Sequence, residues 1–226
     1  MRAQDRLPLI LCFGDSLTAG YQSPTPERPE MRETPYGIFL QERLGNRARV
    51  AVSGVCGELT GEMVMRFRRD VLAHAPASVV ILGGTNDLGW NAGPADIMRN
   101  LLNMYELALG AEIRPVAVTV PSIRAPWPDG DWSVPAGPDQ DSGGRRWLQD
   151  HIQRRLALNR LIGDYCKARG VACLDLFAAT VEPDTLALAA PYSNDGLHLT
   201  TDGYRLLATL LYERVFAEQI GLVARG

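Results

Sequence analysis

The segment Gly14-Asp15-Ser16 places a serine hydroxyl directly after a short apolar run, residues 9–13. Such a run predicts a buried strand, and a side chain at the end of a buried strand is held rigidly yet stays open to a ligand. A serine hydroxyl becomes a nucleophile when a base lies within hydrogen-bond reach and a third group orients that base. By itself, the tripeptide is more typical of a turn that caps the next helix, so the interpretation depends on the rest of the chain.

A base for this serine must come from three histidines, whose surroundings differ. His74 closes a helical stretch just before a proline, where a histidine favours the carbonyl groups of the last turn. His151 falls among charged residues on the polar side of a helical pattern, so we expect it to be solvated. His198 stands in a loop three residues after Asp195. Because one tight turn can then set the carboxylate against the imidazole, we predict His198 as the base and Asp195 as its orienting group.

Acyl transfer also needs hydrogen-bond donors aimed at the oxygen that becomes negatively charged. The backbone N–H groups of Ser16 and Gly57 and the side-chain amide of Asn86 are the candidates. Each has an ordinary explanation when taken alone: Gly57 as a turn residue with positive φ, and Asn86 as the first residue of an Asx turn. Their placement after separate strands favours the oxyanion interpretation.

Apolar runs alternate with helical patterns almost to the end of the chain. The expected strands are residues 8–13, 49–53, 78–82, 114–120 and 171–174, and the expected helices lie near residues 35–44, 58–73, 94–109, 147–168 and 201–220. This alternation predicts an α/β fold with a parallel sheet and helices on both sides, in one domain over residues 1–226. The carboxyl ends of parallel strands open on the same rim, so all the residues named above should meet there.

Composition excludes several other functions. The net charge is −3 and the basic residues are scattered, so we expect no nucleic-acid partner; the cluster Arg66, Arg68 and Arg69 is typical of a solvated helix face. No stretch is long and apolar enough to span a membrane, and no signal segment precedes the first strand. The four cysteines lack metal-ligand spacing and fit a reducing compartment. We therefore expect a cytoplasmic protein without a metal or organic cofactor, and the sequence contains no indication of its oligomeric state.

The pattern resembles the SGNH hydrolases, also called the GDSL esterase/lipase family. Four blocks carry the resemblance, in the family's order: Gly14-Asp15-Ser16-Leu17, Gly54-Val55-Cys56-Gly57, Gly84-Thr85-Asn86-Asp87 and Asp195-Gly196-Leu197-His198. The resemblance implies a flavodoxin-like three-layer α/β/α sandwich with a five-stranded parallel sheet. It also implies Ser16 as nucleophile, His198 as base and Asp195 as its orienter, with an oxyanion hole formed by the N–H of Ser16, the N–H of Gly57 and the side chain of Asn86.

Two positions separate this chain from related patterns. Family members often carry an asparagine where this chain has Val52; that asparagine is not catalytic in the family, so the change concerns loop geometry. Thr18 stands where the nucleophile elbow Gly-x-Ser-x-Gly has its last glycine, so an ordinary α/β-hydrolase is not expected.

The expected substrate is a small-molecule carboxylic ester with a small or short acyl group, acetyl esters included. Trp90, Trp127 and Trp132 follow strand ends and are candidates for binding it, although they could equally pin an irregular loop, residues 121–146, onto the domain. Several alternatives stay open: a thioesterase or an acyltransferase with the same machinery, a cysteine hydrolase using Cys56, and a non-catalytic ligand-binding relative. The sequence alone does not choose the acyl chain or the alcohol.

Overall fold

The structure is a computed structural model that describes residues 7–125 and 142–217. Five parallel strands form its main sheet: β1 (Leu9–Gly14), β4 (Arg49–Gly54), β5 (Ser78–Leu82), β6 (Arg114–Val118) and β7 (Ala172–Leu174). Their order is β4-β1-β5-β6-β7, and each neighbouring pair is parallel. This is the flavodoxin-like order. The predicted fold class is therefore confirmed, and the predicted strands differ from the observed ones by at most two residues at either end.

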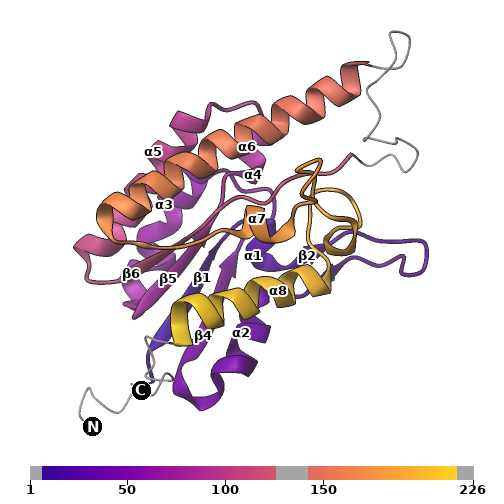
Figure 1. Ribbon diagram of the computed structural model, residues 1–226. Helices are drawn as coiled ribbons and strands as arrows, with labels where there is room; N and C mark the ends of the chain where they lie inside the picture. Colours follow the sequence, from indigo (N-terminus) through magenta and orange to yellow (C-terminus); the bar gives the residue numbers. More distant parts are fainter. Residues whose placement is uncertain (1–6, 126–141, 218–226) are drawn as a thin grey trace, which may run out of the picture.

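Both faces of the sheet are buried, which explains why its central strands read as continuous apolar runs. On one face, Ile10 and Cys12 of β1 pack with α2 (Tyr36–Leu44) and α8 (Thr201–Leu211). On the other face, Leu11 and Phe13 pack with three further helices. These are α3 (Thr60–Asp70), α5 (Pro94–Gly110) and α6 (Ser142–Arg169). Figure 1 shows the resulting three layers, with the long α6 crossing one face and α8 covering the other.

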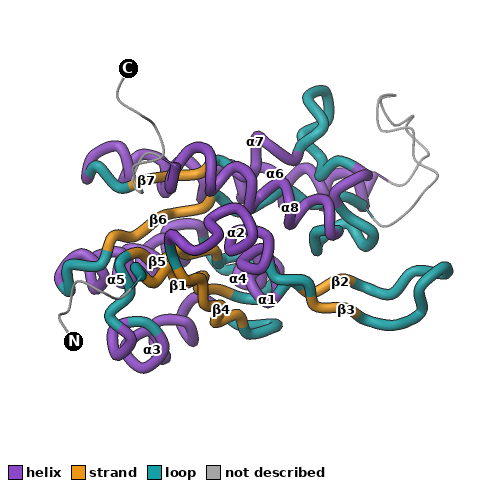
Figure 2. Tube along the Cα trace, turned by 90° about the horizontal axis from the view of Figure 1, so that it is seen from below, coloured by secondary structure: helices purple, strands orange, loops and turns teal. Residues whose placement is uncertain are grey.

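The sequence pattern did not predict the shortest elements. They are α1 (Ser16–Ala19), α4 (Thr85–Gly89), α7 (Leu176–Thr180), the hairpin β2 (Tyr21–Gln22) with β3 (Arg32–Glu33), and the 3₁₀ turns η2 (Gly45–Arg47) and η4 (Ala190–Tyr192). The 3₁₀ turn η3 (Leu72–His74) and the π turn η5 (Tyr212–Phe216) lie at the ends of the helices predicted over residues 58–73 and 201–220. Elements of two to five residues contain too few positions to show a hydrophobic period. The β2–β3 hairpin extends away from the body of the molecule (Figures 1 and 2).

The topology creates a crevice at the carboxyl ends of two central strands. The chain passes from β1 to β4 on one side, and then to β5 on the other side of β1. Such a reversal is where open α/β sheets bind ligands. Ser16 follows β1 and Asn86 follows β5, so these two predicted site residues flank the crevice.

Candidate active site

Ser16 begins the short helix α1 immediately after β1. Asp15 caps this helix, because its Oδ1 accepts a hydrogen bond of 2.9 Å from the N–H of Leu17. The end of β4 packs closely against α1: a Cβ at Gly54 would lie 2.2 Å from the backbone nitrogen of Ala19, so only glycine fits there. The serine is therefore held by a capped turn between two strands, and its side chain is almost fully buried.

The structure brings Ser16, His198 and Asp195 together in a continuous hydrogen-bonded chain. The Oγ of Ser16 lies 3.0 Å from the Nε2 of His198, although the residues are 182 positions apart in the sequence. The Nδ1 of His198 lies 2.7 Å from the Oδ2 of Asp195. This order of hydroxyl, imidazole and carboxylate is the one in which a base can accept a proton from a nucleophile.

A tight turn before α8 presents the histidine and the carboxylate. The Oδ1 of Asp195 accepts hydrogen bonds from the N–H groups of Leu197 at 2.8 Å and His198 at 2.7 Å. Gly196 has φ +82°, and a Cβ there would lie 2.1 Å from the carbonyl oxygen of Arg124. The turn thus needs glycine for two reasons, and it connects to the segment after β6 through a backbone hydrogen bond from Arg124 to Gly196.

Residues of the first loop, which the sequence analysis missed, complete the surroundings of the histidine and its carboxylate. The hydroxyl of Ser23 donates to the Oδ2 of Asp195, and the ring of Tyr21 lies 4.5 Å from the imidazole of His198, centroid to centroid. Burial acts to raise the pKa of Asp195, but the hydrogen bonds from His198, from Ser23 and from two backbone N–H groups outweigh it. The pKa of Asp195 therefore lies well below its ordinary value, and the carboxylate is ionised at neutral pH. No local spacing marks Ser23, since it reaches the site only through the fold of the hairpin.

The three predicted donors lie at the ends of β1, β4 and β5. One amide hydrogen of Asn86 is used internally, because Nδ2 donates to the carbonyl of Glu58 at 2.9 Å; an amide NH₂ has a second hydrogen to offer. Gly57, next to Glu58, is exposed and has φ +79°. Among the residues that the structure describes, none accepts a hydrogen bond from the N–H of Ser16 or of Gly57. Each of the three donors thus has an N–H hydrogen that the described residues do not use.

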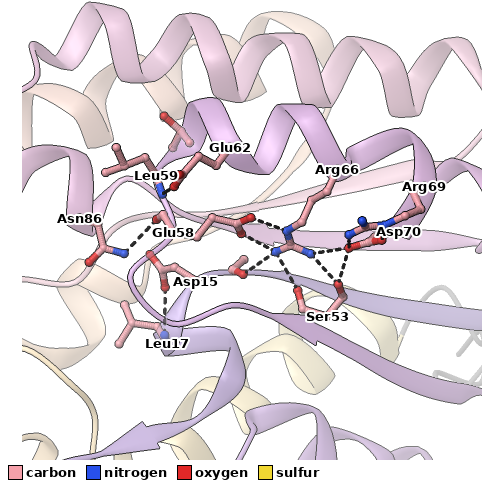
Figure 3. Close-up of polar contacts among 12 residues, drawn as sticks. Asp15, Leu17, Ser53, Glu58, Leu59, Glu62, Arg66, Arg69, Asp70 and Asn86 are labelled. Carbon is pink, nitrogen blue, oxygen red and sulfur yellow. Dashed lines mark hydrogen bonds and ion pairs between the residues drawn. The ribbon is translucent and has the colours of Figure 1, made fainter.

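The prediction of a solvated helix face for Arg66 was wrong. Its guanidinium is buried and makes two hydrogen bonds of 2.6 Å to the carboxylate of Glu58. It also donates to the carbonyl of Gly14 at 2.9 Å and to the hydroxyl of Ser53 at 2.6 Å, and it pairs with Asp70 at 2.9 Å. As Figure 3 shows, this one side chain from α3 joins the ends of β1 and β4 to the loop that carries Glu58. Helical periodicity alone could not reveal this, because the partners come from other segments.

Asp15 is a second buried ionisable side chain at the site. Its Oδ2 has no hydrogen-bond partner among the described residues. Burial is the main cause that raises the pKa of Asp15 to about 7, and the nearby carboxylates of Asp87 and Glu58 add to it.

Because its pKa is higher in the folded than in the unfolded chain, protonated Asp15 stabilises the fold. This contribution is complete below about pH 4 and is lost as the pH rises through about 7. We expect Asp15→Asn, which can still cap α1, to become more stable relative to the unchanged protein by roughly 2–4 kcal/mol between pH 4 and pH 7.5. Urea unfolding across this range measures the difference. The control is Asp96→Asn, at an exposed position on α5, whose stability should vary with pH as that of the unchanged protein does. If the stability of Asp15→Asn also ran parallel to that of the unchanged protein across this pH range, the raised pKa of Asp15 would be contradicted.

A pocket of about 470 Å³ opens beside these residues. Asn86 and Asp195 line it on the side of the hydrogen-bonded chain, and Trp90 and Trp147, both exposed, line its outer part. The prediction that His151 is solvated was wrong: its side chain is 4% exposed and its ring lies 4.2 Å from that of Trp147. Burial and two neighbouring arginines lower the pKa of His151. Trp127 and Trp132, the other two predicted binding residues, lie outside the described residues.

The described part of the chain contains neither a cluster of metal ligands nor a membrane-spanning helix. Within residues 7–125 and 142–217, no three His, Cys, Asp or Glu side chains gather as a metal site requires. None of the helices described there is both long and apolar enough to cross a membrane.

Comparison with known proteins places this arrangement in a family. The fold is similar to that of a GDSL-like lipase from Bacteroides thetaiotaomicron, with 24% identity, a TM-score of 0.68 and coverage of 91% of this chain and 86% of the other. A lipase/acylhydrolase from Enterococcus faecalis has 24% identity and a TM-score of 0.69, covering 97% of this chain and 99% of its own. A carbohydrate acetylesterase from Sinorhizobium meliloti has 20% identity and a TM-score of 0.68, covering 93% and 99%.

No curated protein matches the sequence. The model of the GDSL-like lipase/acylhydrolase family, however, matches residues 12–206, which run from β1 into α8 and include all four blocks of the predicted resemblance. The chain therefore belongs to the GDSL-like lipase/acylhydrolase family.

Proposed function

We propose that this protein hydrolyses carboxylic esters through an acyl-enzyme formed on Ser16. The observation that carries the proposal is the chain of hydrogen bonds from Ser16 through His198 to Asp195, at 3.0 and 2.7 Å. Family membership supports a hydrolase, and two similar structures are described as a carbohydrate acetylesterase and an aryl esterase. The name of the first favours a small acyl group such as acetyl.

In the proposed cycle, the Nε2 of His198 accepts the hydroxyl proton while Ser16 attacks the ester carbonyl. Ionised Asp195 stabilises the imidazolium and keeps the ring in the tautomer with a proton on Nδ1. The N–H groups of Ser16 and Gly57 and the free amide hydrogen of Asn86 hold the oxyanion. His198 then returns the proton to the leaving alcohol, and a water molecule repeats the sequence on the acyl-enzyme.

A cysteine nucleophile is less well supported. Partial burial, together with the carboxylates of Glu33 and Asp15, raises the pKa of the Cys56 thiol. A raised pKa lowers the fraction of thiolate, which is the reactive form. Ser16, by contrast, already has a base in place. Hydrolysis of thioesters and acyl transfer to an alcohol would use the same residues as ester hydrolysis. The cytoplasmic location of the protein remains a prediction from the sequence.

Labelling with a fluorophosphonate tests the proposed function directly. A serine activated by a neighbouring base reacts with this probe, so we expect a mass increase that maps to the peptide containing Ser16. A series of p-nitrophenyl esters of increasing acyl length then defines the acyl preference. Absence of labelling, together with no turnover of any ester, would contradict the proposal.

Asn86→Ala is expected to lower kcat by about 10²- to 10³-fold, the usual cost of losing one oxyanion donor. Because the ground-state carbonyl needs this donor less than the transition state does, KM should change little. Steady-state hydrolysis of p-nitrophenyl acetate measures both parameters. Asn103→Ala, at an exposed position on α5, is the matched control. An unchanged kcat for Asn86→Ala would place the oxyanion site elsewhere.

A further inference from the structure

Arg155 is a buried cation in the wall of the pocket, and the proposed mechanism does not use it. Its side chain is only 1% exposed, and it comes from the face of α6 that also carries His151. Its Nε donates to the carbonyl of Pro121 at 3.2 Å, and one Nη makes a long contact of 3.5 Å with the carbonyl of His151. A guanidinium has five N–H donors, so most of its hydrogen-bonding capacity is not taken up by the described residues.

The other arginines near the pocket are better satisfied. Arg124 forms an ion pair of 2.7 Å with Glu182. Arg154 donates to the side chain of Asn91 at 2.8 Å and to the carbonyl of Ala92 at 2.6 Å, at the end of α4. Among the residues that the structure describes, Arg155 has no carboxylate within ion-pair distance. Burial, reinforced by Arg154, lowers the pKa of Arg155 to about 10, so the group remains charged at neutral pH.

A charge that is buried without a partner is costly, and a protein tolerates it mainly where a ligand supplies the opposite charge. The planar fork of a guanidinium matches the two oxygens of a carboxylate. The pocket also adjoins the proposed reaction centre, since Asn86 and Asp195 line it together with Arg155. Asp195 forms no direct ion pair with the arginine, and both of its oxygens accept hydrogen bonds from His198, Ser23 and backbone N–H groups.

We propose that Arg155 binds a carboxylate of the substrate, so that the site selects esters that carry a negative charge on the acyl or the alcohol part. This inference rests on the proposed ester hydrolysis and adds the substrate class to it. The two exposed tryptophans at the outer part of the pocket would then cover the apolar portion of the substrate, and the buried guanidinium would set its orientation.

Two pairs of esters of equal size test the selection on either side of the ester bond. On the acyl side, the mono-p-nitrophenyl ester of adipic acid is compared with its neutral primary amide; on the alcohol side, 4-acetoxybenzoate is compared with 4-acetoxybenzamide. We expect the unchanged protein to prefer the charged member of at least one pair by about 10- to 100-fold in kcat/KM, mainly through KM. Equal rates within both pairs would overturn the proposal.

Substitution of Arg155 identifies the residue responsible. Arg155→Met keeps the length and removes the charge, so the preference should fall to less than about threefold. Arg155→Lys keeps the charge without the fork and should retain only part of the preference. The matched control is Arg160→Met, which removes the same charge from an exposed position on α6 and should keep the full preference. A preference that survives in folded Arg155→Met would overturn the assignment.

A binding measurement separates this inference from the proposed function. Calorimetric titration of Ser16→Ala with the charged and the neutral member of both pairs requires no turnover, and we expect the carboxylate of at least one pair to bind at least tenfold more tightly. Equal affinities within both pairs would overturn the role of Arg155 even if the protein cleaves esters. If no ester is cleaved but the carboxylate still binds selectively, the proposed function fails and the anion site stands. The measurement also decides the question should Arg155→Met not fold.

Discussion

Ser16→Ala should lower kcat for ester hydrolysis by about 10⁵- to 10⁶-fold, the largest effect that we expect of any single substitution. The substitution removes the attacking oxygen but keeps the backbone N–H and the capped turn of α1, so the oxyanion donors and the pocket remain. Substrate binding should therefore change little, and thermal unfolding should be close to that of the unchanged protein. The rate of p-nitrophenol release from p-nitrophenyl acetate gives the loss.

The His198→Ala variant and the double variant Ser16→Ala/His198→Ala make this prediction specific. A nucleophile and its base act as a unit, so the double variant should be about as slow as Ser16→Ala alone rather than showing the product of two losses. Multiplicative losses would mean that the two residues act separately, despite the 3.0 Å contact between their side chains. Normal turnover by Ser16→Ala would exclude the acyl-enzyme altogether.

Arg66→Met should destabilise the fold by about 3–5 kcal/mol, the cost of leaving one partner of a buried ion pair alone. The carboxylate of Glu58 is 7% exposed and would lose two hydrogen bonds of 2.6 Å, while the carbonyl of Gly14 would lose its donor from Arg66. Methionine retains most of the apolar volume of the arginine stem, but it also loses the guanidinium that lies 4.1 Å from the ring centroid of Phe13. Urea unfolding at neutral pH measures the change in the free energy of unfolding.

Two comparison variants separate the buried pair from a general effect of charge. Arg69 lies three residues further along the same helix and also pairs with Asp70, but its side chain is 76% exposed. Arg69→Met should therefore cost no more than about 1 kcal/mol. The double variant Arg66→Met/Glu58→Met replaces the pair by apolar side chains and should recover much of the lost stability. A loss of under 1 kcal/mol for Arg66→Met would show that the cluster contributes no more than a surface pair.

The same cluster connects stability to the proposed chemistry. The carbonyl of Glu58 accepts the hydrogen bond that orients Asn86, and Glu58 adjoins Gly57 in the chain. The carboxylate of Asp87 also accepts hydrogen bonds from the N–H of Thr60 at 3.0 Å and its hydroxyl at 2.6 Å, which joins the start of α3 to the segment after β5. Donors that must be placed before the reaction are thus held by buried polar contacts rather than by the loop alone.

The sequence by itself determined the architecture and the candidates for the reacting groups. Continuous apolar runs mark strands that are buried on both faces, and the alternation with helical patterns leaves a parallel sheet as the natural arrangement. Once the strand ends share a rim, the separate blocks that contain Ser16, Gly57, Asn86 and His198 must approach one another. These conclusions depend on periodicity and order along the chain, which a sequence contains in full.

Only the tertiary structure decided which polar side chains are buried and what they contact. Arg66, His151 and Arg155 lie on helix faces that are polar in sequence, yet the neighbouring segments cover all three. Ser23 reaches Asp195 across 172 residues through a hairpin too short to show a period. The physical reason is the same in each case: the free energy of a buried polar group depends on its partners, and these partners come from distant segments that local patterns do not identify.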